Sequence, residues 1–293
     1  MHDQYFGQFL LNKELLNLEQ LRDILNRERA SRPHLGLLAI DASILNSSQV
    51  EQIHRLQQAF DKNFGEIAVD KGFLTLRQLE DLLVVQQGRR LNISQTIIDS
   101  GYLTLAELEA AWQEYKNTTS LKKGKTDALY GNLCGIVRAV LDFSSAGSEG
   151  DILYEYIALF LRIIPRFLGE EPIIALNHTR ASGTLITQTM RGVVNISTGL
   201  VMNDDLLLKM ARRYSGENLT RVDELALDSI AEFLNSTNGI FTVSMSEGGL
   251  ELDLEPQCIQ TAGVTPVEMA FRVPIETSCG IIDFYICLDE TLV

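Results

Sequence analysis

A carboxylate and a carboxamide lie three residues apart in the C-terminal part of the chain, at Glu232 and Asn235. They belong to segment 222–239, where apolar residues recur at the spacing of an amphipathic helix. The stripe predicted to be buried comprises Leu227, Ile230, Ala231 and Leu234. Asp228, Glu232 and Asn235 share a second stripe about 120° around the helix, and Gly239 is predicted to end it. Such a helix presents a carboxylate and an amide side by side.

The two residue types limit the chemistry that this pair can perform. An asparagine amide accepts and donates hydrogen bonds but has no basic lone pair with which to take a proton. A reaction that uses Asn235 must therefore depend on orienting a reactant, and orientation alone can lower a barrier substantially. The alternative interpretation is a solvated helix face, on which acidic and amide residues are common.

The pattern Asp228-x3-Glu232-x2-Asn235, followed by Gly239 and Pro256, resembles the signature helix of the CheX/CheC family of chemotaxis phosphatases. The resemblance covers residues 150–293. Segment 190–197 resembles the family's glycine-containing strand, 204–214 the next helix, 246–254 a hairpin across a Gly-Gly turn, and 280–288 the last strand. Segment 152–167 is the expected opening helix. The resemblance implies an α/β (α+β) domain with an antiparallel sheet and flanking helices.

The same resemblance implies roles for the polar stripe. Asn235 would hold the water that attacks an aspartyl phosphate on a receiver, and Glu232 would pair with the receiver's active-site lysine. An aspartyl phosphate is an activated acyl phosphate, so placing water in line with phosphorus is the main requirement. Asp228 matches the motif as a third catalytic residue, with a role at the helix surface or first turn as the alternative. The chain would need no cofactor of its own, and Mg²⁺ would belong to the receiver.

The first 120 residues contain four repeats of 29 residues, marked by Leu16, Leu45, Leu74 and Leu103. Each repeat carries a capping box, in which an Asn or Thr and the Gln or Glu three residues later satisfy each other's backbone amides. These pairs are Asn17 with Gln20, Asn46 with Gln49, Thr75 with Gln78, and Thr104 with Glu107. Each repeat is predicted to form two short helices, which are too small to bury their own apolar faces, so the repeats must stack.

Segment 64–79 is similar to the MshEN and type II secretion ATPase N-terminal domains, some of which bind cyclic di-GMP. The nucleotide-binding version places an arginine just before an apolar-glycine pair, where its guanidinium can contact phosphate and stack on guanine. The corresponding residues here are Tyr5, His34, Asn63 and Asn92. Cyclic di-GMP is therefore not expected to bind, with Arg89 and Arg90 as the residues that could still contribute. Protein docking or spacing is the expected role.

Composition and charge exclude several classes of protein. The chain has 293 residues and a net charge of −14, which allows two domains but does not suit a nucleic-acid partner, since phosphate binding needs clustered Lys and Arg. The sequence contains neither a membrane-spanning run nor a signal peptide, which predicts a cytoplasmic protein without membrane insertion. Its four cysteines and four histidines lack the spacing of metal ligands, so no metal site is expected.

These patterns predict helical repeats at 1–120, a linker and connecting helix at 121–150, and a CheX-like phosphatase domain at 151–293. The predicted function is a signalling protein that dephosphorylates the aspartyl phosphate of a CheY-like response-regulator receiver, with the repeats as a docking or sensory module. The expected partner is the phosphorylated receiver. A homodimer and a docking partner for the repeats stay open. The alternative is a non-catalytic adaptor or sensor that binds a receiver or cyclic di-GMP, and loss of Asn235 would separate the two.

Overall fold

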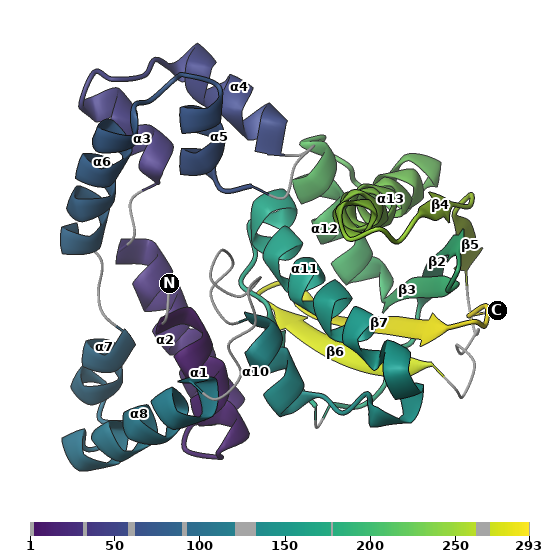
Figure 1. The fold of residues 1–293 in the computed structure, drawn as a ribbon, viewed down its shortest axis with the longest axis horizontal. Coiled ribbons are helices and arrows are strands. Elements are labelled where there is room, and N and C mark those ends of the chain that lie inside the picture. Colours follow the sequence, from purple (N-terminus) through teal and green to yellow (C-terminus); the bar gives the residue numbers. More distant parts are fainter. Residues whose placement is uncertain are drawn as a thin grey trace. The chain divides into compact units, whose positions relative to one another are not determined.

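The computed structural model describes residues 3–31, 34–57, 62–89, 93–120, 133–176, 178–261 and 270–292. The chain divides into two compact units, Met1–Leu141 and Asp142–Val293. As Figure 1 shows, the described part of the first unit is helical, whereas the second combines helices with a sheet. Each unit buries its own set of apolar side chains.

Each 29-residue repeat forms two helices in the described residues. The first helices of the four repeats are α1 (Asp3–Asn12), α3 (Leu35–Asp41), α5 (Phe64–Asp70) and α7 (Ile93–Asp99), and the second are α2 (Leu18–Ser31), α4 (Ser47–Gln57), α6 (Leu76–Arg89) and α8 (Leu105–Ser120). All four predicted capping boxes form with reciprocal hydrogen bonds of 2.8 to 3.3 Å. Each box satisfies backbone amides that the first helical turn would otherwise leave unpaired.

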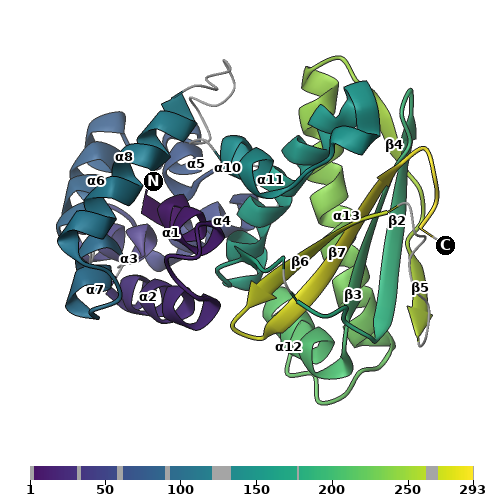
Figure 2. The ribbon, with the colours of Figure 1, turned by 90° about the horizontal axis from the view of Figure 1, so that it is seen from below.

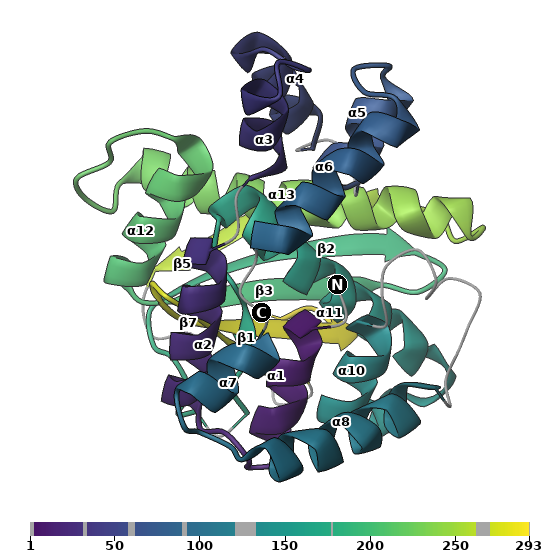
Figure 3. The same ribbon diagram turned by 90° about the vertical axis from the view of Figure 1, so that its left-hand side faces the viewer.

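The repeats pack in two pairs, an arrangement that the sequence analysis did not specify. Helix α2 contacts α7 and α1 contacts α8, so the first repeat pairs with the fourth, while α4 contacts α5 and α3 contacts α6 to join the second and third. Figure 3 shows these two groups of helices. Equivalent ring pairs lie in both groups: Phe6 stacks on Trp112 with centroids 4.0 Å apart, and His54 lies 5.3 Å from Phe64. Both pairs of repeats therefore use equivalent helix faces for their contact.

The second unit is built on an antiparallel sheet. Its strands are β1 (Ile173–Ile174), β2 (Thr184–Gly192), β3 (Ile196–Met202), β4 (Leu252–Leu254), β5 (Cys258–Thr261), β6 (Phe271–Thr277) and β7 (Gly280–Leu288). The order is β1-β6-β7-β3-β2-β4, with β5 also paired to β2, and every pair is antiparallel.

Three helices, α11 (Gly150–Leu168), α12 (Asp204–Ser215) and α13 (Glu224–Glu247), cover one face of this sheet (Figure 2). On that face, Tyr156 and Phe160 of α11 pack on Phe284 of β7, with ring centroids 5.5 and 4.4 Å apart. Helix α12 corresponds to the helix expected at 204–214, and α11 to the opening helix. The expected antiparallel sheet with flanking helices is therefore confirmed.

Three local expectations were wrong. Helix α13 does not end at Gly239 but continues to Glu247, because Ile240 and Phe241 extend its buried face. Segment 246–254 is consequently not a hairpin: it contains the helix end, a turn in which Gly249 has φ of +84°, and strand β4. Segment 190–197 is not one strand, since it spans the end of β2, a turn and the start of β3.

The predicted linker is described only in part, because residues 121–132 lie outside the described residues. Helix α10 (Leu133–Val140) contacts α1, and a 3₁₀ turn, η1 (Ser144–Glu149), leads into α11. Within the described residues, every helix is too short or too polar to cross a membrane.

Candidate functional site

The predicted polar stripe lies on α13. The Asp223 carboxylate caps this helix by accepting a hydrogen bond of 3.3 Å from the Ala226 amide. The apolar stripe is buried as expected, apart from Leu227, which is half-buried. Asp228 and Glu232 are exposed and Asn235 is half-buried. The helix thus turns its polar stripe to solvent and lets Asn235 reach both solvent and the interior.

The structure brings Glu232 and Asn235 together but leaves Asp228 apart. Asn235 Nδ2 donates to Glu232 Oε2 over 3.2 Å. Glu232 Oε1 accepts from Ser236 Oγ at 3.3 Å, and the Ser236 hydroxyl lies 3.1 Å from the Tyr214 hydroxyl of α12. Burial, opposed by the Ser236 hydrogen bond and assisted by the negative charge of Glu232, raises the pKa of Tyr214. Tyr214 therefore remains a neutral hydroxyl beside the carboxylate.

Beneath Asn235 lies a residue that the sequence did not single out, Gln188 of β2. Its side chain is only 2% exposed. Gln188 Nε2 donates both to Asn235 Oδ1 and to the Glu255 backbone carbonyl, at 2.8 Å each. Gln188 Oε1 accepts from Asn238 Nδ2, also at 2.8 Å. All hydrogen-bonding groups of this buried amide are thus used, except one acceptor lone pair.

The hydrogen bonds continue into the core through Asn238, which is fully buried one turn after Asn235 on α13. Asn238 Oδ1 accepts from the Tyr156 hydroxyl of α11, and Asn238 Nδ2 lies 3.0 Å from the Thr198 hydroxyl of β3. Burial raises the pKa of Tyr156, so its hydroxyl stays protonated. We call Tyr156, Gln188, Thr198, Asn235 and Asn238 the amide network. It joins two helices and two strands to the exposed stripe.

Sequence patterns could only hint at this network. Gln188 stands between apolar residues in the segment Leu185-Ile186-Thr187-Gln188-Thr189-Met190, flanked by two threonines, and Asn238 lies on the buried side of α13. A polar residue at such a position signals a buried hydrogen bond. The identity of its partners depends on the pairing of β2 with β3, which places Gln188 directly opposite Thr198.

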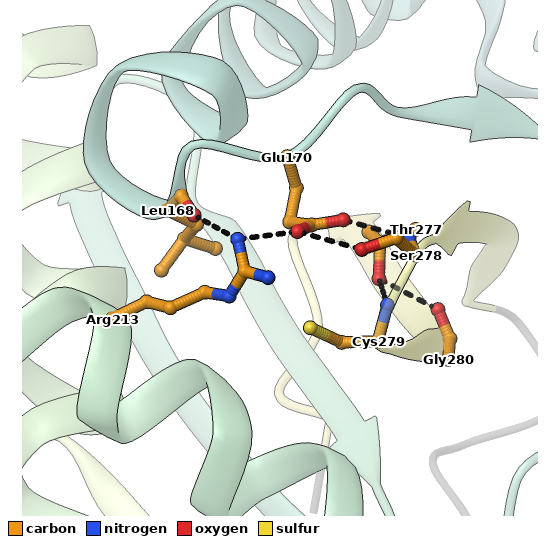
Figure 4. Close-up of polar contacts among 7 residues, drawn as sticks. All are labelled: Leu168, Glu170, Arg213, Thr277, Ser278, Cys279 and Gly280. Atoms are coloured by element: carbon orange, nitrogen blue, oxygen red, sulfur yellow. Dashed lines mark hydrogen bonds and ion pairs between the residues drawn. The ribbon is translucent and has the colours of Figure 1, made fainter. Parts of the chain in front are cut away.

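A second polar cluster centres on the buried carboxylate of Glu170, which is 1% exposed (Figure 4). Its carboxylate pairs with Arg213 Nη1 at 2.5 Å and accepts from the Ser278 amide at 2.7 Å and from the Ser278 hydroxyl at 2.9 Å. Arg213 also donates to the Leu168 carbonyl. Burial, and then the Glu170 charge, raise the pKa of the neighbouring Cys279 thiol. We call Glu170, Arg213 and Ser278 the Glu170 cluster. It fastens α12 and the β6–β7 turn to the segment after α11.

The remaining site expectations concern metals and nucleotides. Among the described residues, His, Cys, Asp and Glu side chains do not gather into a group that could hold a metal ion, and all four cysteines are free thiols. His34 and Asn63 occupy the N-cap positions of α3 and α5. Asn92 and Arg90 lie outside the described residues, as do the side chains of Tyr5 and Arg89. The expectation on cyclic di-GMP stays a prediction.

Comparisons with known proteins give matches of fold alone. Neither a protein-family model nor a curated protein matches the chain. Similar solved structures include CheX from Desulfovibrio desulfuricans (14% identity, 47% of this chain and 99% of that one, TM-score 0.40) and CheX from Vibrio vulnificus (14%, 47% and 96%, 0.41). A third is a complex of CheX with CheY, BeF3 and Mg²⁺ from Borrelia burgdorferi (16%, 47% and 98%, 0.39). The structural neighbours of about half of this chain are therefore CheX/CheC-like chemotaxis proteins.

Proposed function

We propose that the second unit hydrolyses the aspartyl phosphate of a CheY-like receiver and that the α13 stripe is its active site. One observation carries this proposal: Asn235 is fixed from inside by Gln188, touches Glu232 on its outer side, and is still half-exposed. An amide held in this way can orient a water molecule without reorganising during the reaction. The sequence resemblance of the stripe supplies the substrate class.

The chemistry assigned to Asn235 is positional. Asn235 Oδ1 has one lone pair left after accepting from Gln188, and a water that donates a hydrogen to it keeps its own lone pairs for attack on phosphorus. The attacking oxygen forms a bond to phosphorus as the bond to the aspartyl oxygen breaks, and the aspartate leaves as a carboxylate. Phosphate takes up the proton of the water. The side chain of Asn235 gains and loses no proton.

Glu232 is assigned to docking. Its carboxylate is exposed and, among the described residues, accepts hydrogen bonds only from Asn235 and Ser236, at 3.2 and 3.3 Å, so oxygen lone pairs remain for an ammonium group. A receiver lysine would form a charge-assisted hydrogen bond there and bring the phosphoryl group next to Asn235. We assign Mg²⁺ to the receiver, where it would neutralise the phosphoryl charge. Asp228, exposed one turn earlier on α13, is proposed as a third contact to the same partner.

A non-catalytic adaptor is the second candidate, because an exposed acidic helix face could dock a receiver without hydrolysing it. The buried support of Asn235 favours catalysis. Docking through a solvated side chain gains little from a fixed amide orientation, whereas positioning a water depends on it. For the N-terminal part we propose a docking module in the repeats at 1–120, joined through 121–150 to the phosphatase domain at 151–293.

The test uses receivers encoded in the same genome, phosphorylated with acetyl phosphate and freed of the donor. Release of phosphate is followed with and without the full-length chain. We expect one receiver to lose phosphate faster in the presence of the chain, in proportion to the amount added. If every receiver that binds the chain keeps its intrinsic rate, the phosphatase proposal fails and the adaptor is correct.

A further inference from the structure

We infer that Gln188 is a positioning residue that fixes which end of the Asn235 amide faces the interior. The inference begins at the Glu255 backbone carbonyl, which can only accept hydrogen bonds. It lies 2.8 Å from the Gln188 side-chain amide, so that end of Gln188 must be its nitrogen. The second hydrogen on this nitrogen then needs an acceptor, and at 2.8 Å it finds Asn235 Oδ1.

The Asn238 amide, as it is oriented in the structure, fits the same orientation of Gln188. Gln188 Oε1 accepts from Asn238 Nδ2, and Asn238 Oδ1 in turn accepts from the Tyr156 hydroxyl. Turning Gln188 over would place its oxygen against two oxygens, those of Glu255 and Asn235, and its nitrogen against the nitrogen of Asn238. Because Gln188 and Asn238 are 2% and 0% exposed, water cannot relieve these conflicts.

The Glu255 carbonyl is itself held in place. The Glu255 amide donates to the Thr189 carbonyl of β2 at 2.9 Å. The next residue is Pro256, and a proline restricts the residue before it to extended backbone conformations. This gives a physical reason for a proline at that position. Pro256 limits the movement of the carbonyl that sets the orientation of Gln188, and through Gln188 that of Asn235.

The consequence lies at the exposed end of the amide network. With its oxygen anchored to Gln188, Asn235 points Nδ2 toward Glu232 and keeps one Oδ1 lone pair free, which is the arrangement the proposed hydrolysis uses. The catalytic part of this inference rests on the proposed function. The orientation of the amide is a property of the folded protein and can be measured by itself.

The test is Gln188→Glu, in which a side chain of nearly the same size carries an oxygen acceptor in place of the amide NH₂ group and its two donor hydrogens. We expect kcat for dephosphorylation to fall about 10- to 100-fold, with KM for the receiver little changed. A buried carboxyl has a raised pKa, and its protonated form regains one donor. The activity of the variant relative to the wild type should therefore rise as the pH is lowered. Ser278→Ala, which weakens the separate Glu170 cluster, is the control and should keep the wild-type kcat.

A second measurement does not require activity. In ¹⁵N-labelled full-length protein, the Asn235 side-chain NH₂ signals are assigned by their loss in Asn235→Ala. We expect them to shift in Gln188→Glu and to stay in place in Ser278→Ala. Unchanged Asn235 signals in a folded Gln188→Glu protein overturn the inference, whether or not the chain is a phosphatase. Shifted signals in a chain without phosphatase activity support the positioning and refute only the proposed function.

Pro256→Ala provides a milder variant should Gln188→Glu fail to fold, since Pro256 is exposed. It leaves every side chain of the amide network intact and loosens only the Glu255 carbonyl. We expect a several-fold lower kcat and a smaller shift of the same Asn235 signals. A wild-type spectrum and wild-type kcat for Pro256→Ala would show that the carbonyl does not control Asn235.

Discussion

The capping boxes of the first unit and the buried polar contacts of the second unit use polar side chains for different tasks. In the first unit the four capping boxes join residues that are three positions apart, all at exposed helix starts. In the second unit Gln188 bonds to side chains 47 and 50 positions away, and Glu170 bonds to Ser278 across 108 positions. Local bonds secure the start of one helix, whereas long-range bonds hold helices on a sheet.

The two polar clusters of the second unit also differ from each other. The Glu170 cluster centres on a carboxylate that is 1% exposed and presents no acceptor to a partner. The amide network begins at an equally buried tyrosine and ends at the half-exposed amide of Asn235. Buried polar side chains are normally hydrogen-bonded, and the buried members of both clusters have such partners. The amide network differs in ending at a residue of the polar stripe on α13.

The largest expected effect is the loss of catalysis in Asn235→Ala. Accelerated dephosphorylation should fall by about 100-fold or more, because the attacking water loses its fixed partner. Receiver binding should be largely retained, and the free energy of unfolding should fall by about 1 kcal/mol or less, because water can reach the vacated side of Gln188. Phosphate release, receiver binding and urea unfolding measure the three quantities. A wild-type rate of dephosphorylation in this variant would show that the stripe is only a solvated helix face and not an active site.

Glu232→Ala should weaken both docking and turnover. It removes a charge-assisted hydrogen bond of about 1.5–3 kcal/mol, which corresponds to roughly 10- to 100-fold in receiver affinity. Calorimetric titration with the receiver in the presence of BeF3 and Mg²⁺ gives the affinity. Glu247→Ala removes the same charge from the exposed end of the same helix and should bind like the wild type. Equal affinities for both variants would remove Glu232 from the interface.

Glu170→Gln should have the opposite effect to the variants of the α13 stripe: it should lower the stability of the protein without affecting catalysis. Losing the charge that bonds to Arg213 and Ser278 should cost about 1.5–3 kcal/mol in the free energy of unfolding. Urea unfolding measures the loss, with Glu217→Gln as an exposed control of equal charge change. A reduced kcat at unchanged receiver affinity would mean that the Glu170 cluster also supports the active site. The Glu170 cluster and the amide network would then not differ in function.

A smaller and local effect is expected from Asn46→Ala in the first unit. Removing this N-cap should destabilise the start of α4 by about 1 kcal/mol, because the Gln49 amide loses its acceptor. Hydrogen–deuterium exchange should speed up in the first turn of α4 and not in α13. Ser48→Ala, at an exposed position two residues after Asn46, is the control. Faster exchange throughout the first unit would show that the capping boxes act beyond their own helices.

No measurable effect is expected from cyclic di-GMP. The position before each apolar-glycine pair lacks the arginine that would hold a phosphate, and His34 and Asn63 stand there at helix N-caps instead. Calorimetry at micromolar nucleotide should show no heat of binding. Stoichiometric binding would contradict this prediction and indicate a sensory role for the first unit, with Arg89 and Arg90 as the candidate phosphate contacts.

Sequence alone determined the features that depend on neighbouring residues. The capping boxes, the amphipathic face of α13 and the adjacency of Glu232 and Asn235 all follow from spacings of three or four residues, and the structure confirms each of them. The end of α13 was misjudged for a related reason. Gly239 is a local helix breaker, but the burial of Ile240 and Phe241 against other elements outweighs that preference.

Only the tertiary structure decided which distant residues meet. The period of 29 residues shows that the repeats are equivalent but not that the first pairs with the fourth, because the same faces could also bury one another in sequence order. The sequence likewise shows a glutamine in the strand segment 184–192 without showing what it contacts. The partners of Gln188 come from α13 and from Glu255, which directly follows β4, and a buried amide must bond to whatever polar atoms these segments bring to it.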